Sequence, residues 1–183
     1  MTLIASRHLQ FEQLNADHAD ELYAVLTTPS VLAFIDPDGS RQTLEELKTE
    51  YAVRARGPLN PVFPDERWFN VAIRLSSSTS EAVGRLEATS YGTWGEVAFL
   101  LGKPWWGKGL ASEALCWWHD YLADVVPGVQ WWATVHPNNH RSIKLLTRFG
   151  YERVDSSKRP ELQSFDEGDL CFFLPNYAKK HHL

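Results

Sequence analysis

The spacing of apolar positions changes several times along the chain, and each change predicts a different element. Residues 3–14 carry apolar groups at alternating positions near Leu9 and Phe11, which predicts a first strand. From Asp17 the spacing becomes that of one helix face, and Pro29 lies beyond the predicted end of this helix. The chain therefore begins with a strand followed by a helix.

A second helix and a long loop follow. Thr43 and Glu46 have the spacing of a capping box, and apolar residues continue the helical pattern as far as Gly57. The segment 57–67 contains three prolines and is predicted to be a loop. It also carries two acidic residues, which makes it a candidate for recognising a cationic amine.

Three strands are predicted in quick succession after this loop. Apolar residues alternate over 69–75 and 83–88, and the nearly unbroken apolar run at 96–101 predicts a strand buried on both faces. A serine-rich turn at 76–80 and a glycine-containing turn at 92–95 separate them. Strands joined by such short connections should form an antiparallel meander.

The second half alternates helices and strands. Helical spacing covers 109–123 and 139–149, with Gly150 in the position of a left-handed helix cap, and residues 131–135 alternate as a strand between them. A strand–helix–strand unit of this kind is a parallel crossover.

The chain is predicted to end in a hairpin of 151–155 with 170–174, followed by a frayed tail at 179–182. Together these elements predict a mixed α/β fold: a mostly antiparallel central sheet with one parallel β-α-β crossover and helices on both faces. We find no internal repeat and no linker, so residues 1–183 are expected to form a single domain.

Composition excludes some classes of function. The 183 residues carry 18 basic and 23 acidic side chains, a net charge of −5, which argues against nucleic acid as a partner. No apolar run approaches the ~18 residues of a membrane span, and the first residues lack the apolar segment of a secretion signal. We therefore expect a cytoplasmic protein without a membrane partner.

The potential metal ligands do not form a site. Cys116 and Cys171 are far from any second cysteine or histidine cluster, which favours two reduced thiols. His136 and His140 have helical ligand spacing, but Pro137 makes this segment a strand-to-helix connection. No metal is expected.

The segment 102–113 links a predicted buried strand to a helix and places Gly107 and Gly109 two residues apart. Such glycines permit positive φ, and free amides at a helix N-terminus attract phosphate. A P-loop would require Ser or Thr at Gly109, and a dinucleotide-binding loop would require a third glycine at Ser112. The sequence of this loop therefore fits a nucleotide-binding protein poorly.

A second segment combines Asn139, at a predicted helix start, with Ser142 one turn later on the same face. Together, Gly107-Lys108-Gly109-Leu110-Ala111-Ser112-Glu113-Ala114-Leu115, then Asn139-x-x-Ser142 and Phe149-Gly150-Tyr151, resemble the GNAT superfamily of acetyl-coenzyme A dependent N-acetyltransferases. They look most like the branch that contains the ribosomal-protein alanine N-acetyltransferases.

This resemblance implies specific roles. The coenzyme A diphosphate would bind backbone amides of six consecutive residues: Trp106, Gly107, Lys108, Gly109, Leu110 and Ala111. Phe99 and Leu101 would hydrogen-bond the pantetheine arm through their backbones, and Asn139 and Ser142 would face the arm and the thioester. The implied activity is transfer of an acetyl group from acetyl-coenzyme A to a primary amine, either a protein N-terminal α-amine or a small molecule.

The chain departs from the family pattern at two positions. Pro104 replaces a Gln or Arg, and Leu146 stands where many members have the tyrosine that protonates the departing thiolate. Ser142 is then the candidate acid, directly or through water. Glu96 is the candidate base by its match to an acidic residue of this branch, and Glu87 is the alternative.

Two other functions remain open: a coenzyme A-binding module without catalysis, and transfer of another acyl group such as succinyl.

Eight tryptophans include three adjacent pairs, 105–106, 117–118 and 131–132. One member of each pair can enter the core, and the outward members are candidates for an acceptor cleft or a homodimer interface.

Overall fold

The computed structural model of the chain describes residues 2–35, 42–77, 81–175 and 177. Part of the predicted serine-rich turn, at 78–80, and the predicted tail at 179–182 lie outside the described residues. Within the described part no helix is long and apolar enough to cross a membrane.

The described strands form one eight-stranded sheet in the order β1-β2-β3-β4-β5-β6-β8-β7. The strands are β1 (Thr2–Ala5), β2 (Leu9–Gln13), β3 (Glu66–Leu75), β4 (Ala82–Tyr91), β5 (Trp94–Leu101), β6 (Gln130–Val135), β7 (Glu152–Val154) and β8 (Leu170–Leu174). The α-helices are α1 (His18–Leu26), α2 (Pro29–Leu32), α3 (Leu44–Arg56), α4 (Leu110–Val125) and α5 (His140–Phe149), with 3₁₀ turns at η1 (Lys103–Trp105) and η2 (Ser156–Lys158).

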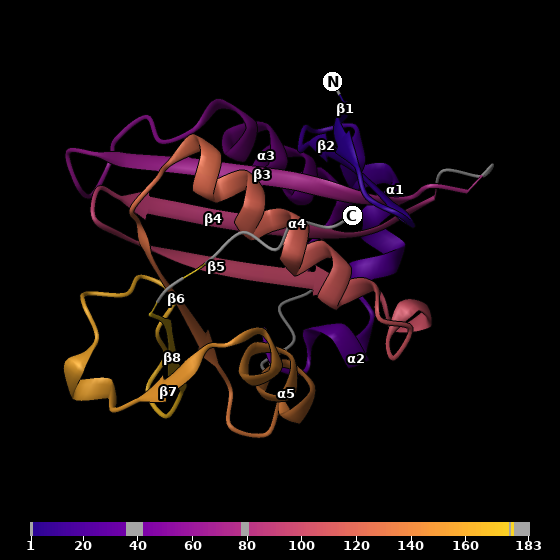
Figure 1. Cartoon of the computed structure of the whole chain (residues 1–183). Helices are drawn as coiled ribbons and strands as arrows, with labels where there is room; N and C mark the ends of the chain where they lie inside the picture. The colour runs from indigo at the N-terminus through magenta and orange to yellow at the C-terminus, as the bar shows by residue number, and fades with distance from the viewer. Residues whose placement is uncertain (1, 36–41, 78–80, 176, 178–183) are drawn as a thin grey trace.

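Only the β5–β6 pair is parallel within this sheet; all the other neighbouring strands run antiparallel. The α4 helix connects these two parallel strands as the predicted crossover (Figure 1). The predicted mixed sheet, the meander β3–β4–β5 and the terminal pairing of β7 with β8 are therefore confirmed.

Helices cover both faces of the sheet. Trp118 and Leu122 of α4 and Leu146 of α5 belong to one core cluster, on what we call the α4 face. Leu22 of α1 and Tyr51 of α3 belong to a second cluster, on the α3 face. Figure 1 shows α4 in front of the strands and α1 and α3 behind them.

Alternation along β5 assigns its side chains to these faces. Val97 and Leu101 pack in the α4-face cluster, whereas Leu100 packs against the α3-face cluster. Glu96 and Ala98 therefore point to the α3 face together with Leu100, because successive residues of a strand alternate. The two faces of β5 thus serve different parts of the molecule.

Two local signals produce the predicted helix boundaries. The Thr43 hydroxyl accepts a hydrogen bond from the Glu46 amide at 3.3 Å, and a Glu46 carboxylate oxygen accepts one from the Thr43 amide at 2.7 Å. This capping box satisfies two donors at the start of α3. At the other end of the chain, Gly150 closes α5 with φ of 109°, as predicted.

Two boundaries differ from the prediction, and one short helix was not expected. The single strand expected at 3–14 is two strands, because a tight turn closed by the Ser6 amide and the Leu9 carbonyl at 2.8 Å interrupts it. Pro29 lies beyond the end of α1 at Leu26, as predicted, and begins the additional short helix α2, consistent with its fixed φ at a first helical position. The loop predicted at 57–67 ends at residue 65, since Glu66 and Arg67 already pair with β4.

The tryptophans are all at least partly buried, and all eight lie in the described residues. Trp105 and Trp118 enter the core while Trp106 and Trp117 are partly exposed, as expected for adjacent pairs. Trp131 and Trp132 are both buried, because they sit on opposite faces of a strand that is covered on both sides. The homodimer interface suggested for outward tryptophans stays a prediction.

Candidate active site

The central sheet opens between β5 and β6. These strands pair only at their starts, where Trp94, Gly95 and Glu96 stand opposite residues 130–132. Beyond Glu96 no described strand pairs with this edge of β5. The two strands thus part after Glu96, and we call the place where they part the β5–β6 gap.

Backbone groups of β5 line this gap. The Gly102 amide donates to the Val83 carbonyl of β4 at 2.9 Å, so the backbone groups of Phe99 and Leu101 point the other way, toward the gap. The Leu101 carbonyl accepts one hydrogen bond, from the Trp106 indole nitrogen at 2.7 Å. The remaining amide and carbonyl groups of these two residues form an open sheet edge to which an extended, amide-containing ligand can bind.

Free amides at the start of α4 adjoin the gap. Gly107 and Gly109 have φ of 75° and 82°, and a Cβ on either would meet no atom within 4 Å. The Trp106 amide donates to the Lys103 carbonyl at 3.2 Å, but none of the amides from residue 107 to residue 111 donates to a described residue. With the helix dipole behind them, these amides have the geometry and polarity that suit an anion.

Glu113, the acidic residue of the first turn of α4, is directed away from this site. One carboxylate oxygen accepts from the Ser6 hydroxyl at 2.6 Å and the His8 amide at 2.7 Å, and the other lies 2.8 Å from His8 Nδ1. Burial alone would raise the pKa of Glu113, but these hydrogen bonds outweigh it and lower the pKa overall. The Glu113 carboxylate therefore connects α4 to the turn between β1 and β2. This contact agrees with the structural role that is expected for an acidic residue in the first turn of a helix.

The start of α5 borders the same gap. Asn139 caps this helix, with its Oδ1 accepting from the Ser142 amide at 3.2 Å, and both residues are partly exposed. Arg141, between them, places its guanidinium carbon 4.6 Å from the centroid of the Trp106 ring. This contact, which sequence reasoning missed, joins the two motifs at the mouth of the gap.

Two carboxylates lie on the α3 face of the sheet near the closed end of the gap. Glu96 is buried and accepts from the amides of Gln163 and Ser164 at 2.7 and 2.9 Å, and from the Tyr91 hydroxyl at 3.2 Å. It therefore anchors the loop that follows η2 to the sheet. Glu87 stands directly opposite Ala98 in the β4–β5 register.

Ala98 marks an uncovered part of the sheet. It is exposed, although it lies in the middle of a central strand. The loop around Gln163 covers Glu96 on one side, and the α3-face cluster packs against Leu100 on the other. The α3 face is thus exposed at Ala98, next to Glu87 and Glu96, and we call this exposed part of the sheet the Ala98 surface.

Several candidate residues do not contribute to the chemistry of the gap. Leu146 is fully buried in the α4-face cluster and offers no proton donor. In the described residues no three His, Cys, Asp or Glu side chains gather as a metal site, and Cys116 and Cys171 form no disulfide. Glu66 was proposed for amine recognition, but its carboxylate already accepts hydrogen bonds from neighbouring residues, including one from the Trp68 indole nitrogen at 2.7 Å.

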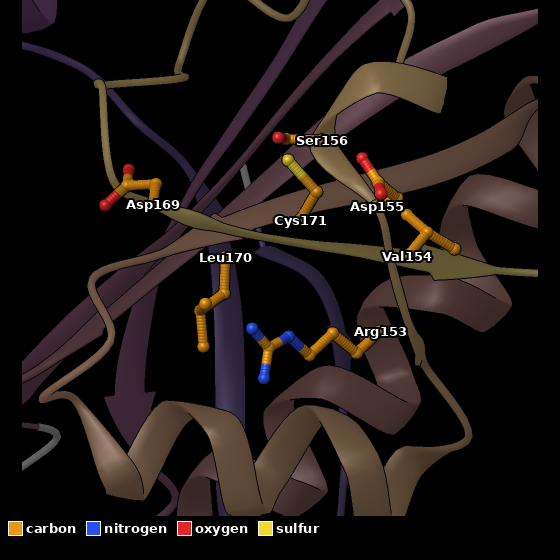
Figure 2. A pocket seen from close by; sticks show the side chains of 7 residues that line it. All are labelled: Arg153, Val154, Asp155, Ser156, Asp169, Leu170 and Cys171. Atoms are coloured by element: carbon orange, nitrogen blue, oxygen red, sulfur yellow. The ribbon is translucent and has the colours of Figure 1, made fainter.

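A separate cavity of about 490 Å³ lies at the β7–β8 edge. Figure 2 shows Arg153 and Leu170 on one side of β8 and Ser156 and Cys171 on the other. Strand β8 separates β7 from β6, so this cavity does not adjoin the β5–β6 gap.

Comparison with known proteins gives one consistent result. Residues 8–152 match the family model described as the acetyltransferase (GNAT) domain. No curated protein sequence gives a significant match.

Solved structures resemble the fold over nearly the whole chain. The ribosomal-protein α-N-acetyltransferase RimL, solved with coenzyme A, superposes with a TM-score of 0.73 at 14% identity over 94% of this chain and 96% of its own. A GNAT-family acetyltransferase from Bacillus anthracis gives 0.69 at 18% identity over 94% and 96%. The aminoglycoside acetyltransferase AAC(6')-Ib, solved with coenzyme A, gives 0.66 at 16% identity over 90% and 92%.

Proposed function

This chain belongs to the GNAT family of acetyltransferases, and we propose that it transfers an acetyl group from acetyl-coenzyme A to a primary amine. The acceptor is either a protein N-terminal α-amine or a small-molecule amine. The observation that carries the proposal is the run of free amides at 107–111 beside the open edge of β5. An anion site and an edge for amide pairing, side by side, suit a ligand with both a diphosphate and a peptide-like arm.

The chain's own residues fit coenzyme A as follows. The amides of Gly107 to Ala111 would hold the diphosphate, and the exposed Lys108 would add positive charge. The backbones of Phe99 and Leu101 would pair with the pantetheine amides in the gap. Asn139 and Ser142 would face the arm from the other side, and Trp106 would contribute its ring rather than its already bonded amide.

Acetyl-coenzyme A supplies the acetyl group as a thioester; the protein must bind the amine in its neutral form and position it. At pH 7, deprotonating an α-amine of pKa about 8 costs about 1 kcal/mol, whereas a lysine of pKa about 10.4 costs about 4–5 kcal/mol. This difference favours an α-amine or another amine of low pKa. The amine would approach the gap over the Ala98 surface, where the sheet is exposed.

Glu96 is the proposed base that takes the amine proton, directly or through water. An ionised carboxylate has about four acceptor sites, and three donors occupy Glu96, so one site is left for the incoming proton. Glu87 is the alternative, opposite the exposed Ala98. With Leu146 buried in the core, the Ser142 hydroxyl is the proposed donor to the departing thiolate.

Calorimetric titration with acetyl-coenzyme A tests the binding half of the proposal, with ATP–magnesium as the ligand control. We expect micromolar binding of acetyl-coenzyme A and its loss in Gly109→Trp, which fills the anion site. Gly128→Trp is the matched control, because Gly128 also has positive φ, 83°, and open space at its Cβ, but follows the far end of α4.

Amine-dependent release of the coenzyme A thiol tests the catalytic half. Binding without any amine-dependent release would replace the enzyme by a coenzyme A-binding module. Faster turnover of succinyl-coenzyme A than of acetyl-coenzyme A would change the transferred group. Absence of acetyl-coenzyme A binding would contradict the proposal as a whole.

A further inference from the structure

Three elements meet on the α3 face where β5 and β6 part. Trp132 of β6 stands opposite Glu96 of β5 in the parallel register, so both side chains point to this face. Thr134, two residues further along β6, points to the same face and lies across the gap from Ala98. The third element is the loop between η2 and β8, residues 159–169, which is anchored to Glu96. This loop therefore borders the Ala98 surface.

Ser164 of the 159–169 loop is fixed at this place by its backbone. Its amide donates to a Glu96 carboxylate oxygen at 2.9 Å, and its carbonyl accepts from the Thr134 hydroxyl at 2.9 Å. These two hydrogen bonds join the loop to β5 and to β6, one on each side of the gap. Because neither of them uses the side chain, the Ser164 hydroxyl is not needed to hold the loop in place.

The direction of two hydroxyl protons determines what Ser164 can bind. Ser164 Oγ lies 3.0 Å from Thr134 Oγ1. A carbonyl can only accept, so the single proton of the Thr134 hydroxyl goes to the Ser164 carbonyl. The Ser164 hydroxyl then donates its own proton to Thr134 Oγ1, and its oxygen keeps its lone pairs. Within the part of the chain that the structure describes no group donates to Ser164 Oγ, and Ser164 is exposed.

Ser164 Oγ and the Glu96 carboxylate offer two hydrogen-bond acceptors to one amine. The carboxylate has one acceptor site left beside its three donors, and Ser164 belongs to the residue whose amide already contacts that carboxylate. A neutral primary amine carries two N–H groups. When each is directed to a fixed acceptor, the remaining lone pair of the amine is oriented toward a thioester in the gap.

We propose that Ser164 Oγ binds the acceptor amine by accepting one of its N–H groups, while Glu96 accepts the other, directly or through water. This inference rests on the proposed function and adds the group that holds the amine in place. Thr134 is a positioning residue, because it takes the Ser164 proton and so turns the lone pairs of Ser164 Oγ toward the amine. Ser164 thus contributes to amine binding and Glu96 to proton removal.

Steady-state kinetics of Ser164→Ala tests the inference, with phenethylamine and an alanine-initiated peptide amide as acceptors. A hydrogen bond that is equally strong in the bound amine and in the transition state changes KM and leaves kcat unchanged. We expect KM for the amine to rise about two- to tenfold, with kcat and the KM for acetyl-coenzyme A unchanged. The melting temperature should stay the same, because the loop is anchored by backbone groups of Ser164.

Two further variants separate the hydroxyl from the rest of the loop. Ser164→Thr retains a hydroxyl and should keep the amine KM close to that of the unaltered protein. Ser156→Ala is the matched control, because Ser156 is another exposed serine of the connection between β7 and β8 but lines the separate cavity at the β7–β8 edge. It should change none of the kinetic constants.

The outcomes separate the inference from the proposed function. The inference would be overturned by an unchanged amine KM in Ser164→Ala, by a fall in kcat in place of the rise in KM, by an equal rise in Ser156→Ala, or by Ser164→Thr being as weak as Ser164→Ala. Each of these results would leave the acetyltransferase activity intact. Failure to bind acetyl-coenzyme A, or to release its thiol with either acceptor, would instead remove the proposed function and the inference with it.

Discussion

Arg141 and Trp106, 35 positions apart in the sequence, meet with the guanidinium carbon 4.6 Å from the indole ring centroid. Trp106 is itself fixed, because its indole nitrogen donates to the Leu101 carbonyl at the end of β5. The pair therefore connects the end of β5, the loop before α4 and the first turn of α5. These are the segments that border the β5–β6 gap.

Arg141→Ala should weaken acetyl-coenzyme A binding. A cation–π contact contributes about 0.5–2 kcal/mol, and because this one exists without ligand, a two- to thirtyfold rise in Kd is the upper bound of the effect. Calorimetry measures this change, and the melting temperature should shift little because Arg141 is exposed. Arg148→Ala, in the last turn of the same helix, is the control and should leave Kd unchanged; equal effects from both variants would contradict a role for the Trp106 contact.

Glu96→Gln and Glu87→Gln should identify the base. If Glu96 takes the proton, Glu96→Gln lowers kcat about 10²- to 10⁴-fold, while Glu87→Gln retains most of the activity. An assay of thiol release with both variants at one pH gives the two kcat values. The opposite pattern would transfer the role to Glu87 and leave Glu96 as the anchor of the 163–164 backbone.

Glu113→Gln should destabilise the protein without removing acetyl-coenzyme A binding. Its carboxylate accepts two strong hydrogen bonds and faces His8, and a charge-assisted bond contributes about 1.5–3 kcal/mol, less at this partly exposed site. Because the folded pKa of Glu113 is lowered, its stabilisation is present above the unfolded pKa and is lost as pH falls through the folded value.

Chemical denaturation of Glu113→Gln and of the unaltered protein, each at pH 7 and at pH 3.5, measures this dependence. The difference in unfolding free energy between the two proteins should shrink at the lower pH. A difference that is the same at both pH values would show that the carboxylate charge does not matter.

His119 should make the protein sensitive to acid. Burial lowers the pKa of His119 from 6.5 to about 3, and the Tyr151 hydroxyl lies 2.9 Å from its Nε2. With a depressed folded pKa, stability is complete above pH 6.5 and falls with pH down to about 3, because the unfolded chain binds the proton more strongly. At pH 5 the loss is about 2 kcal/mol.

His119→Gln removes this titration while retaining a hydrogen-bond partner for Tyr151. Urea unfolding at pH 7.5 and pH 5 should show a smaller loss in the variant than in the unaltered protein. The surface variant His140→Gln, on the exposed first residue of α5, should retain the full loss.

Much of the candidate site was predictable from the sequence because its signals are local. Gly107 and Gly109 adopt positive φ, and Asn139 caps α5, since these features depend on a residue and its immediate neighbours. The backbone roles of Phe99 and Leu101 were implied by the family resemblance, and the Gly102–Val83 hydrogen bond shows that their backbone groups leave the β4 ladder. The ligand contacts of these residues stay predictions.

Other features needed the tertiary structure. The sequence placed Glu113 in the first turn of α4, but it could not show the hydrogen bonds that Glu113 accepts from Ser6 and His8, which are more than 100 positions away. Glu96 was recognisable as an acid at a strand start, but its hydrogen bonds to the backbone at 163 and 164 depend on a loop from the far end of the chain. Such contacts follow from how elements pack, which no local pattern encodes.

The sequence by itself determined the order of most elements, the mixed sheet and the two motifs, because each rests on hydrophobic periodicity or on short-range backbone geometry. Only the tertiary structure decided that β5 and β6 part after Glu96, that Arg141 reaches Trp106, and that Arg54 and Arg85 pair with Glu50 and Glu87 between α3 and β4. The physical reason is that strand divergence and charge pairing depend on the relative placement of whole elements, which is fixed by burial of their apolar faces together.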